Sequence, residues 1–198
     1  MAAQSGTNNP TAPHQSKPPT ILVFGDSLSA AYGLARNQGW VSLLQERLKV
    51  NQLNYSVANR SLSGETTFGG LERLPRALSQ IRPSVVILQL GANDGLRGLD
   101  LKTTRKNLKA MIEKSLAAQA KVVIVGVRLP PNLGEAYLKE FDAIVASLAS
   151  ELRVASVPAM LEGFATDLSY FQDDQIHPNA KAQPMILNTV WKTLKPLL

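Results

Sequence analysis

The amino-acid sequence predicts an α/β fold, a three-layer αβα sandwich built around a parallel β-sheet. Short runs of Val, Ile and Leu alternate along the chain with longer segments of helical periodicity. Runs that are apolar throughout predict strands buried on both faces, as in a parallel sheet. Strand–helix alternation with right-handed crossovers then places helices on both sides of that sheet.

Five apolar runs are predicted strands, and the last of them is the weakest. They cover residues 21–24, 55–58, 85–90, 122–127 and 154–157. Three stripes with apolar side chains three or four residues apart predict amphipathic helices between these strands. The stripes are Trp40, Leu43, Leu44 and Leu48; Leu108, Met111, Ile112 and Leu116; and Leu138, Phe141, Ile144, Val145, Leu148 and Leu152.

The length of 198 residues predicts a single domain, which we expect to span residues 20–198. Residues 1–19 are rich in Ala, Ser, Thr, Asn and Pro and predict a flexible N-terminal tail. No apolar stretch approaches the roughly 18 residues of a membrane-spanning helix, so we expect no integral membrane segment. The chain has no cysteine, which excludes disulfides, zinc–thiolate sites and a cysteine nucleophile.

The chain carries 21 Lys and Arg against 15 Asp and Glu, a formal net charge of +6. This excess favours anionic partners such as phosphate-bearing thioesters or phospholipid headgroups, and it is equally typical of a protein that is simply soluble. The sequence lacks blocks of basic residues, zinc-ligand spacing and basic–aromatic interleaving. We therefore expect no nucleic-acid partner.

Polar segments follow the first four predicted strands, at residues 25–27, 59–64, 91–94 and 128–131. In an open parallel sheet the carboxyl ends of the strands form one edge, where ligands bind at the reversal of strand order. Segments far apart in the sequence are thus expected to converge on one crevice.

Ser27 is the candidate nucleophile, because it lies in the turn that leaves the first predicted strand. A serine hydroxyl needs a base, and of the two histidines only His177 lies outside the predicted tail, which contains His14. Asp174, three residues earlier, is placed to accept the Nδ1 proton and stabilise the imidazolium. The same spacing is typical of a helix start with a surface histidine, and this alternative stays open.

Attack on an ester carbonyl creates an oxyanion that needs preorganised donors. The candidates are the backbone N–H groups of Ser27 and Gly64 and the side-chain amide of Asn93. Glycine at position 64 allows a positive φ and a close approach of the backbone to substrate. Gly64 and the segment 91–95 are also typical of ordinary turns, which leaves a purely structural interpretation open.

Asp26 precedes the candidate nucleophile, and we interpret it as a cap of the following helix. A cation site built from Asp26, Asp94, Asp174 and His177 would offer suitable oxygen ligands. No motif with metal-ligand spacing supports such a site, so we expect no metal and no cofactor.

From about residue 20 to residue 198 the chain resembles the GDSL, or SGNH, hydrolases. The resemblance rests on five motifs in order: Gly-Asp-Ser-Leu-Ser-Ala at 25–30, Asn-x-Ser-x-Ser-Gly-Glu-Thr at 59–66, Leu-Gly-x-Asn-Asp-Gly-Leu-Arg-Gly at 90–98, Arg-Leu-Pro at 128–130 and Asp-Asp-x-Ile-His-Pro-Asn at 173–179. It implies a flavodoxin-like five-stranded parallel sheet with strand order 2-1-3-4-5. It also implies that Ser27 is the nucleophile, His177 the base and Asp174 the orienting acid, with Ser27, Gly64 and Asn93 as oxyanion donors.

The resemblance further implies hydrolysis of carboxylic esters and fatty acyl thioesters, including lysophospholipids and aryl esters, through an acyl-enzyme intermediate. It implies small-molecule substrates, no cofactor, a monomer, and a periplasmic or secreted protein. A loop after the fourth strand shapes the acyl-chain groove in relatives, so Leu129, Pro130, Pro131 and Leu133 are expected to contact substrate.

Two positions depart from the family pattern. Ala31 and Ala92 stand where relatives often have glycine, and we expect their methyl groups near the groove.

Three alternatives follow from the same residues. A deacetylase or esterase for carbohydrate or short aryl esters would prefer acetyl over longer acyl chains, although the Leu and Pro side chains at 129–133 suit an alkyl chain better. A non-catalytic lipid- or ligand-binding domain on the same scaffold would leave Ser27 unreactive. A nucleotide-binding flavodoxin-type module is disfavoured, because the loop after the first strand lacks a glycine-rich phosphate cradle.

Overall fold

A computed structural model describes residues 17–198, and these contain a five-stranded β-sheet. The strands are β1 (Thr20–Gly25), β2 (Ser56–Asn59), β3 (Val85–Gln89), β4 (Lys121–Val125) and β5 (Ala155–Val157). Neighbouring strands all pair in parallel, in the order β2-β1-β3-β4-β5. The predicted fold class and the strand order that the resemblance implies are both confirmed.

Residues 1–16 lie outside the described part of the chain, so the predicted tail at 1–19 is covered only from residue 17 and His14 is not covered. The domain bounds 20–198 stay a prediction. In the described residues β1 begins at Thr20, and the hydroxyl of Tyr55 donates to the backbone oxygen of Leu198 at 3.1 Å.

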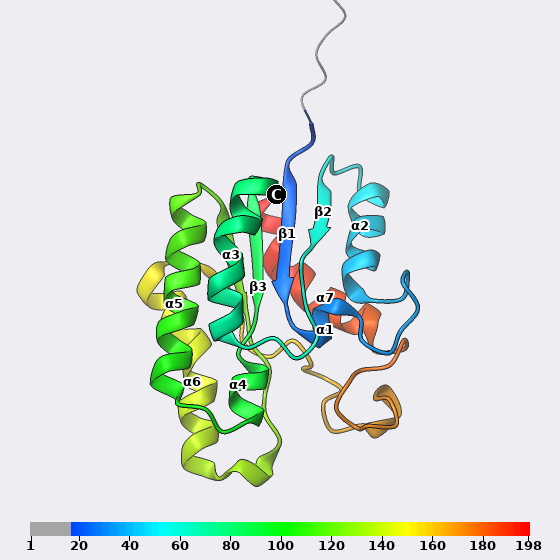
Figure 1. Ribbon diagram of the computed structural model, residues 1–198. Helices are drawn as coiled ribbons and strands as arrows, with labels where there is room; N and C mark the ends of the chain where they lie inside the picture. The colour runs from blue at the N-terminus through cyan, green and yellow to red at the C-terminus, as the bar shows by residue number, and fades with distance from the viewer. Residues whose placement is uncertain (1–16) are drawn as a thin grey trace, which may run out of the picture.

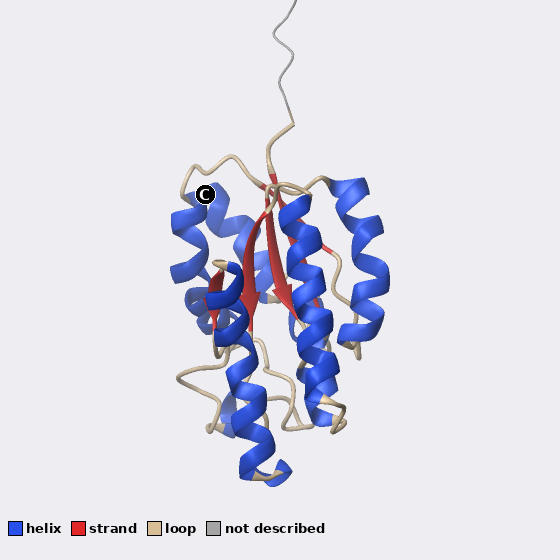
Figure 2. Cartoon of the chain, turned by 90° about the vertical axis from the view of Figure 1, so that its left-hand side faces the viewer, coloured by secondary structure: helices blue, strands red, loops and turns tan. Residues whose placement is uncertain are grey.

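Helices cover both faces of the sheet (Figures 1 and 2). On one face lie α3 (Thr67–Ile81), α5 (Leu101–Ala117) and α6 (Glu135–Leu152), and on the other lie α2 (Trp40–Val50) and α7 (Gln183–Leu194). No helix within residues 17–198 combines sufficient length with sufficient apolar character to cross a membrane. The short elements are α1 (Ser27–Ala30), α4 (Ala92–Leu96), η1 (Pro131–Leu133), η2 (Leu168–Tyr170) and η3 (Lys195–Leu197).

The core consists of two apolar clusters, one on each face of the sheet. In β1, Leu22 and Phe24 belong to the cluster under α3, α5 and α6, whereas Ile21 and Val23 belong to the cluster under α2 and α7. Successive strand residues point to opposite faces. Because both faces are covered, every residue of β3 is buried, which explains the continuous apolar runs in the sequence.

The helical stripes predict α2, α5 and α6, but they do not predict α3 or α7. α3 contains two adjacent glycines and Pro75, all unfavourable in a helix interior. It forms nevertheless, because its buried side chains, among them Leu74 and Leu78, pack against the sheet. α7 carries an apolar stripe that the sequence analysis did not single out: Ile186, Leu187, Val190 and Leu194.

The last residue of β1 is Gly25, which pairs with Gln89 at the end of β3. A methyl group on Gly25 would lie 2.7 Å from Oε1 of Gln89, 2.8 Å from its backbone oxygen and 3.0 Å from Cβ of Ser29. A side chain larger than hydrogen therefore does not fit where the chain turns from β1 into α1.

We expect Gly25→Ala to lower the free energy of unfolding by about 1–3 kcal/mol, because the added methyl group overpacks the β1–β3 contact. Urea unfolding of the variant and of the unaltered protein measures this difference. An unchanged unfolding midpoint would show that Gln89 and Ser29 move aside without cost.

Candidate active site

Ser27 is the first residue of α1 and follows β1 with a single residue, Asp26, between the strand and the helix. Oδ1 of Asp26 caps α1 by accepting the backbone N–H of Leu28 at 3.0 Å. The hydroxyl of Ser29 donates to Oε1 of Gln89 at 2.6 Å, which fixes α1 to the end of β3. The capped turn thus places Ser27 in α1, at the carboxyl end of β1 (Figure 1).

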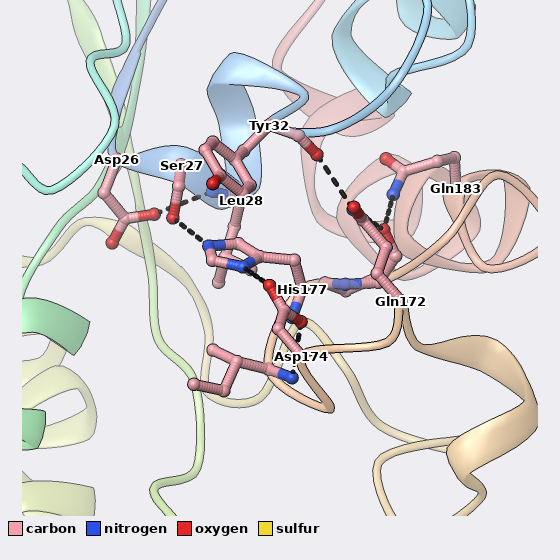
Figure 3. A network of polar contacts seen from close by, with 10 residues as sticks. Asp26, Ser27, Leu28, Tyr32, Gln172, Asp174, His177 and Gln183 are labelled. Carbon is pink, nitrogen blue, oxygen red and sulfur yellow. Dashed lines mark hydrogen bonds and ion pairs between the residues drawn. The ribbon is translucent and has the colours of Figure 1, made fainter.

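A chain of hydrogen bonds links Ser27, His177 and Asp174 (Figure 3). Oγ of Ser27 lies 2.9 Å from Nε2 of His177, across 150 residues of sequence. Nδ1 of the same ring lies 2.6 Å from Oδ2 of Asp174. The segment that carries Asp174 and His177 is an irregular turn, so it is not the helix start with a surface histidine that its spacing left open.

The other carboxylate oxygen of Asp174 holds the turn itself. Oδ1 accepts the backbone N–H groups of Ile176 and His177, both at 2.9 Å. Burial alone raises the pKa of Asp174, but hydrogen bonds from the backbone and ring of His177 and from Ile176 outweigh it and lower the pKa to about 2. The carboxylate is therefore ionised at neutral pH and favours a proton on Nδ1, which leaves Nε2 to accept the serine proton.

The loop that carries His177 is tied to the loop after α1. Gln172 donates its backbone N–H to the carbonyl of His177 at 2.8 Å. Its side-chain amide donates to the carbonyl of Tyr32 at 2.8 Å and to that of Pro178 at 3.2 Å. The Tyr32 ring lies 4.5 Å from the His177 ring, centroid to centroid. The loop of His177 and the loop that follows Ser27 are thus held together by the same contacts.

Gln183 fixes the far side of this loop and was missed by the sequence analysis. It is 2% exposed, accepts the backbone N–H of Trp40 at 3.0 Å and donates to the carbonyl of Pro178 at 3.3 Å. A buried amide at the start of an apolar helical stripe is the sequence signal that points to such a role. Nothing comparable in the sequence marks Gln172.

The loop of Gly64 and helix α4 contact each other at the carboxyl edge of the sheet, where the backbone N–H of Leu62 donates to the carbonyl of Gly25 at 3.0 Å. Gly64 has a φ of +76°, which favours glycine, and its carbonyl accepts a hydrogen bond from Arg97 at 3.0 Å. Nδ2 of Asn93 donates to the carbonyl of Glu65 at 2.9 Å, which leaves its second amide hydrogen available. Within residues 17–198, the backbone N–H groups of Ser27 and Gly64 donate to no protein acceptor, as donors to a substrate must.

Asp94 clamps these two segments together, a role that the sequence analysis missed. Its carboxylate is 3% exposed and accepts the backbone N–H of Thr67 at 2.9 Å and its hydroxyl at 2.5 Å. Asn107 of α5 donates to the same hydroxyl at 3.2 Å. The start of α3, which follows Gly64, is thereby joined to α4, which carries Asn93.

Asp26 and the other acidic residues considered as metal ligands do not gather into one site among residues 17–198. Asp26 is 1% exposed, and burial raises its pKa to about 6. Among the described residues its Oδ2 has no hydrogen-bond partner. No three His, Asp or Glu side chains within residues 17–198 gather closely enough to hold a metal ion.

The residues expected to contact the acyl chain lie in different environments. Leu129 is buried under α4, where a Cβ on Gly95 would lie 2.4 Å from its Cδ1. Pro130 and Pro131 are exposed, and Leu133 packs half-buried against the core. Leu129 therefore packs against α4 in the interior, whereas Pro130 and Pro131 are exposed to solvent.

The two departures from the family pattern are also placed differently from each other. Ala31 ends α1 with a φ of +59°, a left-handed conformation that costs a non-glycine residue about 1 kcal/mol. Ala92 is 8% exposed and belongs to the core cluster of α2 and α7. Its methyl group packs into the interior, which differs from the expectation that it lies near the groove.

Residues 23–183 match the GDSL-like lipase/acylhydrolase family. The chain is 47% identical to the esterase TesA of Pseudomonas aeruginosa, over 90% of this chain and 89% of that protein. It is 40% identical to thioesterase 1/protease 1/lysophospholipase L1 of Escherichia coli strain K12, over 90% of this chain and 85% of that protein.

The fold has a solved counterpart in the psychrotrophic esterase EstA from Pseudoalteromonas sp., in a crystal structure inhibited by monoethylphosphonate. That structure superposes with a TM-score of 0.85 at 40% identity and covers 89% of this chain and 97% of its own. With the match over residues 23–183, these similarities confirm the resemblance that the five motifs indicate. The protein belongs to the GDSL-like lipase/acylhydrolase family.

Proposed function

We propose that the protein is a serine hydrolase that cleaves carboxylic esters and fatty acyl thioesters, including acyl-CoA, aryl esters and lysophospholipids, through an acyl-enzyme intermediate. One observation carries the proposal: the hydrogen-bonded chain from Ser27 through His177 to Asp174, with distances of 2.9 and 2.6 Å. The names of the relatives support the substrate range, since they include an esterase and a thioesterase that is also a lysophospholipase.

In the first half of the reaction, Nε2 of His177 takes the proton of Ser27 as Oγ attacks the carbonyl carbon. Asp174 stabilises the imidazolium that forms. The negative charge on the carbonyl oxygen is stabilised by the backbone N–H groups of Ser27 and Gly64 and by the amide of Asn93. His177 then protonates the leaving alcohol or thiol, and the acyl group stays on Ser27 as an ester.

In the second half, His177 takes a proton from water, which attacks the acyl-enzyme carbonyl at the same site. The tetrahedral intermediate collapses, the proton returns to Oγ of Ser27, and the carboxylic acid leaves. No step needs a cofactor. We further propose, from the family resemblance, that Pro130, Pro131 and Leu133 border the acyl chain and that the protein is a periplasmic or secreted monomer.

Replacing the nucleophile tests the proposal directly. We expect Ser27→Ala to lower turnover of p-nitrophenyl butyrate and palmitoyl-CoA by at least about 10³-fold, because no other side chain is placed to form the acyl-enzyme. A fluorophosphonate probe should label the unaltered protein and leave the variant unlabelled, with the same urea unfolding midpoint for both. Normal turnover by the variant would refute the assignment of Ser27.

The side chain of Asn93 is expected to act on the transition state more than on substrate binding. Asn93→Ala should lower kcat by about 10²–10³-fold and leave KM within a few-fold, since one oxyanion donor is lost. Asn54→Ala, an exposed asparagine in the loop before β2, serves as the matched control and should change neither constant. A rise in KM alone would assign Asn93 to substrate binding.

Asp26 is proposed to be a structural cap. Because its side chain is buried, its titration should be visible in how the free energy of unfolding depends on pH. Its pKa is raised from 3.8 to about 6, so the folded state favours the protonated acid. The corresponding stability is fully present below about pH 4 and lost as pH rises through about 6, a loss of about 3 kcal/mol. Asp26→Asn keeps an acceptor for the N–H of Leu28 and should remove this loss. If the unfolding free energy of Asp26→Asn fell with pH as steeply as that of the unaltered protein, the loss of stability would not come from Asp26.

A further inference from the structure

Large apolar side chains that are exposed to solvent gather at one edge of the molecule. Among the described residues, nine such side chains are strongly exposed. Val50 and Leu116 lie at or near the carboxyl ends of α2 and α5, at the amino edge of the sheet. Leu168 lies in η2. The remaining six lie at the carboxyl edge, in the segments that carry Ser27, Gly64, Asn93 and His177, and we call them the apolar rim: Tyr32, Leu62, Phe68, Leu96, Leu99 and Ile176.

Each of the four segments that bring a functional group to the site also contributes to the rim. Tyr32 follows Ser27 by five residues, and its ring lies against His177. Leu62 and Phe68 flank Gly64 on its two sides, Leu96 and Leu99 follow Asn93, and Ile176 precedes His177. The rim side chains therefore belong to the same four segments as Ser27, Gly64, Asn93 and His177, at the carboxyl edge of the sheet.

Packing within the fold does not require apolar side chains at these exposed positions. Phe68 is 69% exposed at the start of α3, whose buried face is formed by Thr67, Gly70, Leu74, Ala77 and Leu78. A polar residue at position 68 would serve the helix equally well. Single exposed apolar residues are ordinary on protein surfaces, but a set concentrated around one site marks a contact with another apolar body.

The charges of the same loops indicate which apolar body this is. Within residues 31–39, 60–66, 97–100 and 171–182 the exposed cations are Arg36, Arg60, Arg97 and Lys181, and the exposed anions are Asp100, Asp173 and Asp174. These segments carry a net charge of only about +1, so most of the net charge of +6 of the chain lies elsewhere. A surface with apolar side chains, charges of both signs and little net charge suits a zwitterionic lipid surface, which has both signs in its headgroups and no net charge.

We propose that the apolar rim docks the protein on zwitterionic phosphatidylcholine-type lipid surfaces, so that single acyl lipids pass from the surface directly to Ser27. The inference rests on the proposed function, since it concerns how a lipid ester reaches that site. Insertion of the Phe, Leu and Ile side chains between headgroups removes apolar surface from water. The arginines of the same loops can extend their charged groups to the lipid phosphates.

The experiment uses vesicles of ether-linked phosphatidylcholine, which contain no ester to cleave, and measures the protein that sediments with them. We expect the unaltered protein to bind, also at 0.5 M NaCl, because apolar insertion is not screened by salt.

Phe68→Ser should weaken binding about tenfold, and the double variant Leu62→Ser/Phe68→Ser should weaken it further, since part of the inserted apolar area is lost. Val50→Ser is the matched control, an apolar side chain that is 79% exposed at the other edge, and it should bind like the unaltered protein.

Three outcomes would each overturn the inference: the protein does not sediment with the vesicles, Val50→Ser weakens binding as much as Phe68→Ser, or binding occurs only to phosphatidylglycerol vesicles at low salt.

Turnover of the water-soluble ester p-nitrophenyl acetate separates this inference from the proposed function. Phe68→Ser should leave it unchanged, because this ester is small and reaches Ser27 from water. Active protein that does not bind vesicles refutes the docking alone, and vesicle binding without any ester turnover refutes the proposed function alone.

Discussion

The close pairing of β1 with β3 is the constraint on which the active site depends. These two strands sit side by side in the sheet, with Gly25 opposite Gln89 where both end. The next residues of β1 form the turn with Ser27, and the next residues of β3 form α4 with Asn93. Ser27 and Asn93, the proposed nucleophile and the proposed oxyanion donor, thus both lie a few residues beyond the Gly25–Gln89 contact. A side chain at position 25 would overlap with Gln89, so glycine is needed there.

Polar contacts, buried at Asp94 and exposed at Gln172, turn this proximity into a defined geometry. Asp94 joins α4 to the start of α3, and Gln172 joins the loop of His177 to the loop that follows Ser27. Hydrogen bonds of this kind stabilise modestly on balance but are costly to break when buried. They suit a site whose groups come from four separate segments, because two of these are helices of only four and five residues and the other two are loops, so each segment is held in place by its neighbours.

The site combines a polar centre with an apolar surround. Ser27, His177 and Asp174 need hydrogen bonds and charge, whereas the apolar rim offers none. Electrostatic interactions strengthen where water is excluded. A surround of apolar side chains therefore serves two purposes at once: it accepts an alkyl chain or a lipid surface, and it reduces the water that competes for the donors of the oxyanion.

The sequence alone determined the fold class, the five strands and three of the helices, and it indicated Ser27, Asp174 and His177 as candidate catalytic residues, because apolar periodicity and short polar motifs are local properties of the chain. It did not reveal α3, where Pro75 and two glycines conceal a helix that only packing stabilises. Nor did it reveal the roles of Asp94, Gln172 and Gln183, or that Leu129 and Ala92 face the interior. Those were decided by tertiary structure, since a buried hydrogen bond or a packed methyl group depends on partners that are distant in sequence and adjacent only once the sheet has formed.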